Sequence, residues 1–134
     1  SQNCQTAIDC GSDFVVTPGI TKELLTALSN IPIPAIPGIT SVSEAMEILE
    51  KGFTYQKLFP ASIAGGPSFL KSIYAPLPQI NFMPSGGISQ KNASDYLSLN
   101  NVFCVCGTWM VNKEMVAQES WGQLANYIKQ HTSI

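Results

Sequence analysis

A single lysine lies between two aromatic residues near the middle of the chain, in the run TYQKLFP at positions 54–60. Aromatic and apolar residues followed by a proline, which cannot donate to a ladder, predict a short strand. Because side chains alternate along a strand, Tyr55, Lys57 and Phe59 share one face. Removal from water disfavours the ammonium form of lysine and lowers its pKa, so the amine of Lys57 would be available to attack carbonyl compounds. From these residues alone, an edge strand whose lysine prevents aggregation is an equal alternative.

Two later turns have the residues needed to bind a phosphate. Gly86-Gly87 precedes a helix for which Ser89 is the expected cap, and Gly107-Thr108 follows the next predicted strand. Barrels build a phosphate site from their last two strand-to-helix turns, where backbone N–H groups contact the anion. Each turn alone is more simply explained as a tight turn, but two in consecutive positions favour a phosphate site. With Lys57 facing the same opening, the pattern suggests Schiff-base chemistry on a phosphorylated carbonyl compound.

These residues must be positioned by strands and helices that alternate along the chain. We expect strands at 14–17, 33–36, 54–59, 80–83 and 102–106, and the first is apolar enough to be buried on both faces of a parallel sheet. We expect helices over residues 1–10, after Thr21, after Ser41, through 69–73, after Ser89 and over 121–130. Ser41 and Glu44 have the spacing of a capping box. In the helix that follows, the predicted buried face consists of Val42, Ala45, Met46 and Leu49.

A short repeat marks the junctions between these elements. The sequence PGIT at 18–21 recurs at 37–40, and GIS at 87–89 is similar to both. Each copy combines a turn, an apolar residue and a helix cap, so the chain uses one type of junction repeatedly. Alternating strands and helices with short connections predict a parallel α/β sheet with right-handed crossovers. The recurring junction favours a segment of a barrel over a doubly wound sheet, and the dinucleotide-binding pattern GxGxxG is absent.

Composition limits the function further. The chain has 134 residues, enough for one domain but fewer than the ~250 of a complete α/β barrel. It contains no arginine and has a net charge of −2, so no basic patch for nucleic acid is expected, and no apolar run reaches membrane-spanning length. The four cysteines lack CxxC spacing and His131 is the only histidine, so we expect reduced thiols in a cytoplasmic protein, with no metal and no cofactor.

Three segments resemble the 2-keto-3-deoxy-6-phosphogluconate (KDPG) aldolase family, which includes 4-hydroxy-2-oxoglutarate aldolases. They are residues 53–66, 84–89 and 106–109, and the turns at 17–19 and 36–44 also fit. The resemblance implies a class I aldolase, a lyase, on a (β/α)8 TIM-type barrel. It would cleave KDPG to pyruvate and glyceraldehyde 3-phosphate, or 4-hydroxy-2-oxoglutarate to pyruvate and glyoxylate. Family members usually assemble as trimers, and their partner is a small keto acid.

The resemblance also assigns roles to individual residues. Lys57 would form the Schiff base. The substrate pocket would be formed by Pro18, Phe59 and Ser85, with Ser85 near the pyruvyl carboxylate. The distal phosphate would be held by Gly86, Gly87, Gly107 and Thr108.

One departure from the family is large. The family places a general-base glutamate and a carboxylate-binding arginine on its second barrel strand, and a further glycine- and threonine-containing turn on its third. If residues 14–17 form the fourth strand, those strands lie upstream of Ser1, and residues 1–134 are a single domain with strands 4 to 8. Glu44, Glu47 and Glu50 belong to a helix that should pack outside. We therefore expect a piece of a longer protein rather than a truncated relative, inactive alone for lack of the base. The alternative is a non-catalytic half-barrel that assembles through its open sheet edges.

Overall fold

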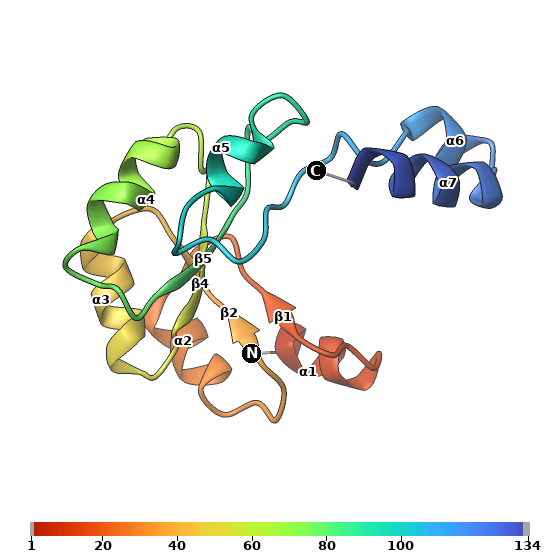
Figure 1. The fold of residues 1–134 in the computed structure, drawn as a ribbon. Coiled ribbons are helices and arrows are strands. Elements are labelled where there is room, and N and C mark those ends of the chain that lie inside the picture. The colour runs from red at the N-terminus through yellow and green to blue at the C-terminus, as the bar shows by residue number, and fades with distance from the viewer. Residues whose placement is uncertain (1, 133–134) are drawn as a thin grey trace.

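Short parallel strands alternate with helices in the computed structural model, which describes residues 2–132 (Figure 1). The elements, in chain order, are α1 (Gln2–Asp9), β1 (Val15–Val16), α2 (Lys22–Leu28), β2 (Ala35–Ile36), β3 (Gly38–Ile39), α3 (Val42–Glu50), β4 (Tyr55–Leu58), α4 (Gly66–Tyr74), β5 (Asn81–Pro84), α5 (Ala93–Leu97), α6 (Lys113–Ala117) and α7 (Trp121–Thr132). The predicted parallel α/β class is therefore confirmed. Helix α6 was not predicted from the sequence.

The strands form two parallel groups that meet at Pro37. Strand β1 pairs with β2, and β3, β4 and β5 form a three-stranded sheet in that order. Residues 37–40 were expected to form only a junction between a strand and a helix, but Gly38 and Ile39 pair with Lys57 and Leu58 as a further strand. Pro37 has no N–H to continue the ladder, but its carbonyl accepts a hydrogen bond of 2.8 Å from the backbone of Lys57. The chain thus passes from one group to the other without a helix between them.

The first strand is less buried than its sequence suggested. Phe14 is 54% exposed and Val16 is also exposed, so the prediction of burial on both faces is wrong. These two side chains share a face by alternation, and that face remains partly exposed. An apolar run identifies a strand but does not show how many layers pack on it.

The expected strand at 102–106 does not form as a regular strand. The segment runs beside β5 and is joined to it by isolated pairs, Phe82 with Val102 and Ser85 with Cys106. No strand in the described part of the chain pairs with its other edge, and Phe103 is 43% exposed. A ladder supported from one side only is less regular than a central strand.

Two of the expected helix caps are confirmed, and one is wrong. Thr21 accepts a hydrogen bond from the Leu24 N–H, and Ser41 and Glu44 form the predicted capping box. Ser89 is not the cap of α5. The N-cap is Asn92, whose side-chain oxygen accepts a 2.8 Å hydrogen bond from the Ser89 N–H.

The predicted apolar face of α3 is only partly correct. Ala45 is buried and Leu49 is half-buried, but Val42 and Met46 are exposed, and Ile48 is buried instead. The helix is therefore rotated relative to the prediction, because its buried face is decided by contact with the sheet.

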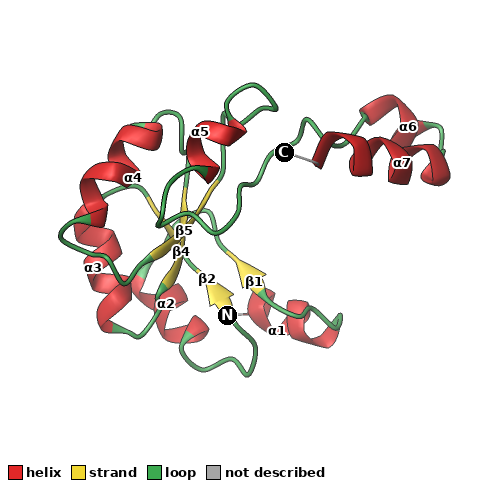
Figure 2. Ribbon diagram, in the orientation of Figure 1, coloured by secondary structure: helices red, strands yellow, loops and turns green. Residues whose placement is uncertain are grey.

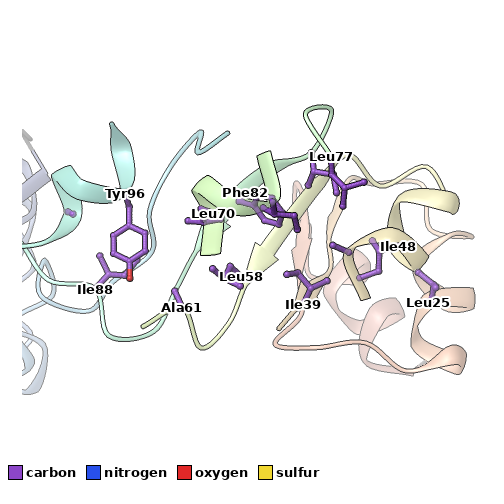
Figure 3. Close-up of a cluster of buried hydrophobic side chains, with 14 residues drawn as sticks. Leu25, Ile39, Ile48, Leu58, Ala61, Leu70, Leu77, Phe82, Ile88 and Tyr96 are labelled. Carbon is purple, nitrogen blue, oxygen red and sulfur yellow. The ribbon is translucent and has the colours of Figure 1, made fainter. Parts of the chain in front are cut away.

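The hydrophobic core lies between the sheet and helices α2 to α5. Figure 2 shows these helices along one side of the strands, whereas α6 and α7 project away from the body. Leu58 and Phe82 come from neighbouring strands and pack in one buried cluster with Ile48 and Leu70 of the helices (Figure 3). On the opposite face of β4, Tyr55 is 50% exposed and its ring meets that of Phe103 edge-on at 5.2 Å. The sheet thus has one face packed by helices and one open face.

Candidate active site

Lys57 lies on the open face of the central strand of the three-stranded sheet. It pairs with Gly38 of β3 on one side and with Met83 of β5 on the other. The alternative of an edge strand is therefore wrong. The side chain is half-buried, and its Nζ lies 4.7 Å from the centroid of the Phe59 ring. The alternation predicted for this strand is confirmed, since Gln56 and Leu58 are fully buried on the opposite face.

A hollow of about 260 Å³ lies at the carboxyl ends of β4, β5 and the 102–106 segment. It is lined by Phe59, Ser85, Gly86, Gly87, Ile88, Cys106, Gly107 and Thr108. Six of the eight residues predicted for the site are therefore in one place, although they come from three separate turns. None of the lining residues carries a charge, so an anion here would be bound by backbone N–H groups and hydroxyls.

The Gly86–Gly87 turn of this hollow requires glycine. Gly86 and Gly87 have φ values of +93° and +76°, in the left-handed region that other residues rarely adopt. A Cβ at Gly87 would overlap the Ser62 side chain. The carbonyls of Ser85 and Gly86 accept hydrogen bonds of 2.7 and 3.1 Å from the N–H groups of residues 61 and 62, which fix this turn to the loop after β4.

Threonine hydroxyls join the neighbouring turns at the same end of the sheet. Thr17 accepts a 3.1 Å hydrogen bond from the Gly38 N–H and donates one of 2.8 Å to the Gly19 carbonyl. Thr40 donates a 2.9 Å hydrogen bond to the Phe59 carbonyl. Thr40 therefore differs from Thr21 at the same place in the repeat, since Thr21 caps a helix whereas Thr40 connects two strand ends.

Lys57 and Pro18 lie outside the 260 Å³ hollow. Lys57 is connected to it through the Phe59 ring, which both contacts the amine and lines the hollow. Pro18 is exposed and borders a different hollow of about 450 Å³ beside α1. Its backbone lies against Gly38, at the end of the neighbouring strand. The structure thus does not bring Pro18 to the glycine turns.

A larger hollow of about 460 Å³ lies between α2 and α3, at the end of the sheet where the strands begin. Its two hydroxyl groups are used within the helix, because Thr26 and Ser29 donate hydrogen bonds to the carbonyls of Lys22 and Leu25 respectively. We therefore do not regard this larger hollow as the site.

The acidic residues of the described chain do not supply a general base to the hollow. None of them lies on a strand, as the sequence indicated. Glu44 is at the carboxyl end of the sheet, but its Oε2 accepts hydrogen bonds from the Thr40 N–H at 2.7 Å and the Ser41 N–H at 2.8 Å. The Thr40 hydrogen bond, followed by those of Ser41, holds the pKa of Glu44 below its ordinary value despite partial burial. The Glu44 carboxylate therefore serves in the N-terminal cap of α3 and not as a base in the hollow.

Cys106 is a lining residue that the sequence reasoning missed. Its pairing with Ser85 brings it to the hollow, and its thiol is exposed. Burial, and to a smaller extent Cys106, raises the pKa of Cys104, two residues earlier. The alternation of the 102–106 segment could have placed Cys104 and Cys106 on one face, but the segment was assigned only as a strand, with no role for its cysteines.

Comparison with known proteins identifies the family. A family model described as KDPG and KHG aldolase matches residues 1–127. The chain belongs to this family. The resemblance inferred from the three segments is therefore confirmed. No helix in residues 2–132 has the length and apolarity needed to cross a membrane.

Relatives within the family differ in length from this chain. The 2-dehydro-3-deoxy-phosphogluconate aldolase of Pseudomonas aeruginosa is 46% identical over 114 residues, which are 85% of this chain and 52% of that protein. The KHG/KDPG aldolase of Escherichia coli K12 is 44% identical over 103 residues, 77% of this chain and 48% of that protein. The chain spans about half the length of the curated relatives it matches.

Solved structures of the family have the same fold. A KDPG aldolase from Legionella pneumophila, with pyruvate captured at low pH as a covalent carbinolamine intermediate, superposes with a TM-score of 0.92 at 41% identity. The match covers 98% of this chain and 64% of that one. The aldolase of Zymomonas mobilis ZM4 with 3-phosphoglycerate superposes with a TM-score of 0.80 at 32% identity, over 84% of this chain and 54% of that one.

Proposed function

We propose that this chain carries the Schiff-base lysine and the phosphate site of a class I aldolase that cleaves KDPG to pyruvate and glyceraldehyde 3-phosphate. The proposal rests on one observation: the half-buried Lys57 lies on the central strand, beside a hollow built from glycine turns. The Legionella relative holds pyruvate as a carbinolamine, which is the adduct that an amine forms with a ketone. Cleavage of 4-hydroxy-2-oxoglutarate to pyruvate and glyoxylate would use the same lysine.

In the proposed reaction, the Lys57 amine adds to the C2 carbonyl of the keto acid, and the carbinolamine loses water to give a protonated imine. The imine withdraws electrons from the neighbouring carbon. The C3–C4 bond then breaks, its electron pair forms an enamine, and the proton of the C4 hydroxyl passes to a general base as the aldehyde leaves. Protonation of the enamine at C3 and hydrolysis of the imine release pyruvate and restore the amine.

The other site residues would orient the substrate. Ser85 would hydrogen-bond the pyruvyl carboxylate, while Phe59 and Pro18 would form walls of the pocket. The distal phosphate would be bound by Gly86, Gly87, Gly107 and Thr108. The uncharged lining of the hollow supports this, because glycine N–H groups and a hydroxyl can bind an anion without a cation. The Zymomonas relative was solved with 3-phosphoglycerate, which is also a phosphorylated carboxylate.

We propose further that residues 1–134 form a single domain with strands 4 to 8 of a (β/α)8 barrel. The open face of the sheet supports this, because Phe14, Tyr55 and Phe103 are about half exposed on it and would become interior in a closed barrel. The remaining strands would supply the general base and the carboxylate-binding arginine, so the chain alone would be inactive. The proposal includes a homotrimer in the cytoplasm, where the four cysteine thiols would remain reduced.

The same exposed aromatic residues favour a second candidate, a non-catalytic half-barrel that binds another protein through its open face. An activity assay separates the two. The protein to test is the completed barrel, by which we mean this chain joined to an upstream segment that supplies the remaining strands. Release of pyruvate from KDPG by the completed barrel, lost in Lys57→Met, supports the aldolase. A folded completed barrel that releases no pyruvate from KDPG or 4-hydroxy-2-oxoglutarate would contradict it.

A further inference from the structure

Trp109 packs directly behind the Gly107–Thr108 turn. The indole is half-buried against the hydrophobic core cluster. A Cβ at Gly107 would overlap the six-membered ring of Trp109, at Cε3 and Cζ3. The ring therefore occupies the space that any side chain at position 107 would need, and it packs against the turn.

The indole is also connected to the end of the chain's last helix. Its Nε1–H donates a 3.2 Å hydrogen bond to the backbone carbonyl of His131, in the last turn of α7. That turn is itself ordered by His131, whose ring stacks on Tyr127 with centroids 3.9 Å apart, and whose Nδ1 lies 2.8 Å from the Tyr127 carbonyl. No side chain of α6 or α7 is buried, and the two helices project from the body (Figure 1). The Trp109 hydrogen bond thus connects the projecting helix α7 to the segment that carries the Gly107–Thr108 turn.

The segment that carries the turn is held by contacts on both sides. Before the turn, the Cys106 N–H donates a 2.9 Å hydrogen bond to the Pro84 carbonyl, and Val105 packs against the core. After the turn, the Val111 N–H donates a 3.1 Å hydrogen bond to the Thr108 carbonyl. The next side chain packed against the core is Trp109, which therefore fixes the turn to the core on its C-terminal side.

We propose that Trp109 is a positioning residue for the phosphate turn and that it couples the last turn of α7 to the affinity of the site for phosphate. This inference rests on the proposed phosphate site. Trp109 lies against Gly107 and does not line the hollow, so its loss would weaken phosphate binding and leave imine formation with pyruvate intact. The end of α7 would act through the same hydrogen bond.

The test measures two quantities in the completed barrel: the Kd for inorganic phosphate, and the yield of pyruvate trapped by borohydride. Trp109→Phe keeps an aromatic ring but removes the N–H, and a chain that ends at Lys129 removes its acceptor. Each change should raise the Kd roughly three- to tenfold, the size expected for one lost hydrogen bond. Together they should raise it no further, because both remove the same interaction. Pyruvate trapping should remain at the parent level.

Trp121→Phe serves as the control. It changes the other tryptophan, which is exposed at the start of α7. This variant should bind phosphate as the parent does. In the Trp121→Phe background, Trp109 is the only tryptophan, and its fluorescence should change on titration with phosphate.

Each remaining outcome decides against a specific claim. A parent that binds phosphate and a Trp109→Phe variant that binds it equally tightly would overturn the positioning role while the phosphate site stands. Loss of phosphate binding and pyruvate trapping together in Trp109→Phe would also overturn it, since the residue would then support the fold in general. A parent with no affinity for phosphate would overturn the proposed phosphate site, and this inference with it.

Discussion

The Nζ of Lys57 lies 4.7 Å from the centroid of the Phe59 ring, two residues further along the same strand face. The same ring lines the hollow at the carboxyl end of the sheet, between the amine and the glycine turns. The Phe59 carbonyl also accepts a hydrogen bond from Thr40, so the position of the ring is coupled to the neighbouring strand. Phe59 is thus the residue through which the nucleophile and the hollow are in contact.

The first prediction concerns this contact. Phe59→Leu in the completed barrel should slow imine formation with pyruvate about two- to fivefold, because the ring that holds the Lys57 amine beside the hollow is lost and the amine is oriented less well. The measurement is the rate of borohydride-dependent incorporation of labelled pyruvate. Tyr55→Leu, on the same strand face but at the opposite end of β4, is the matched control and should leave this rate unchanged. A rate in Phe59→Leu equal to that of the parent would mean that the ring does not orient the amine.

A second prediction concerns the glycine turns. Gly87→Ala and Gly107→Ala should each raise the KM for KDPG roughly tenfold more than the KM for 4-hydroxy-2-oxoglutarate, because the added Cβ displaces a turn against Ser62 or Trp109. The matched control is Gly19→Ala, since a Cβ at Gly19 meets no atom within 4 Å. KM values for KDPG and for 4-hydroxy-2-oxoglutarate, which has no phosphate, provide the comparison. Equal losses for both substrates would mean that these glycines are ordinary turn residues.

The third prediction is a pH dependence of stability that arises from Glu44. Hydrogen bonds from Thr40 and Ser41 lower its pKa below the ordinary value of 4.5, so its contribution is fully present above pH 4.5 and is lost as pH falls through the lowered value. Glu44→Gln should reduce the free energy of unfolding by roughly 0.3–1 kcal/mol at neutral pH. The difference should shrink on acidification, as measured by urea denaturation of the completed barrel.

Glu50→Gln is the control for this effect, since Glu50 is exposed at the other end of α3. The difference in the free energy of unfolding between Glu50→Gln and the parent should not shrink on acidification. If the difference in the free energy of unfolding between Glu44→Gln and the parent grew as the pH fell, the sign would be wrong for a lowered pKa. That result would contradict the capping role of Glu44.

A fourth prediction concerns the open face of the sheet. The chain made alone should self-associate, because Phe14, Tyr55 and Phe103 are about half exposed on that face. Joined to an upstream segment of about 70–80 residues, which is the length of three βα units, it should become a soluble enzyme. Size-exclusion chromatography and pyruvate release compare the two forms. A monomeric, fully active 134-residue chain would contradict the barrel-segment proposal and require a general base among the residues present.

The position of Lys57 could be predicted because it depends on local rules. Side chains alternate along a strand, and a strand ends at a proline such as Pro60, regardless of which residues pack against it. The capping box of Ser41 and Glu44 is equally local. Burial of Phe14 could not be predicted, because an apolar strand does not show whether a second layer exists. The sequence predicted Ser89 as the N-cap of α5, whereas the structure has Asn92 there. Both residue types can cap a helix, and the geometry of the turn decides between them. Cys106 was missed because its place at the hollow comes from pairing with Ser85, a long-range contact.

The central claim is that Lys57 is the nucleophile, and one measurement tests it most directly. The completed barrel is incubated with pyruvate and borohydride, digested, and searched by mass spectrometry for a reduced pyruvate adduct on each lysine. Lys57→Met fills a similar volume without the amine, and Lys57→Arg keeps the charge but not the nucleophile. We predict an adduct on Lys57 alone and none in either variant. An adduct that persists in Lys57→Met, or a folded parent that forms none, would contradict the account.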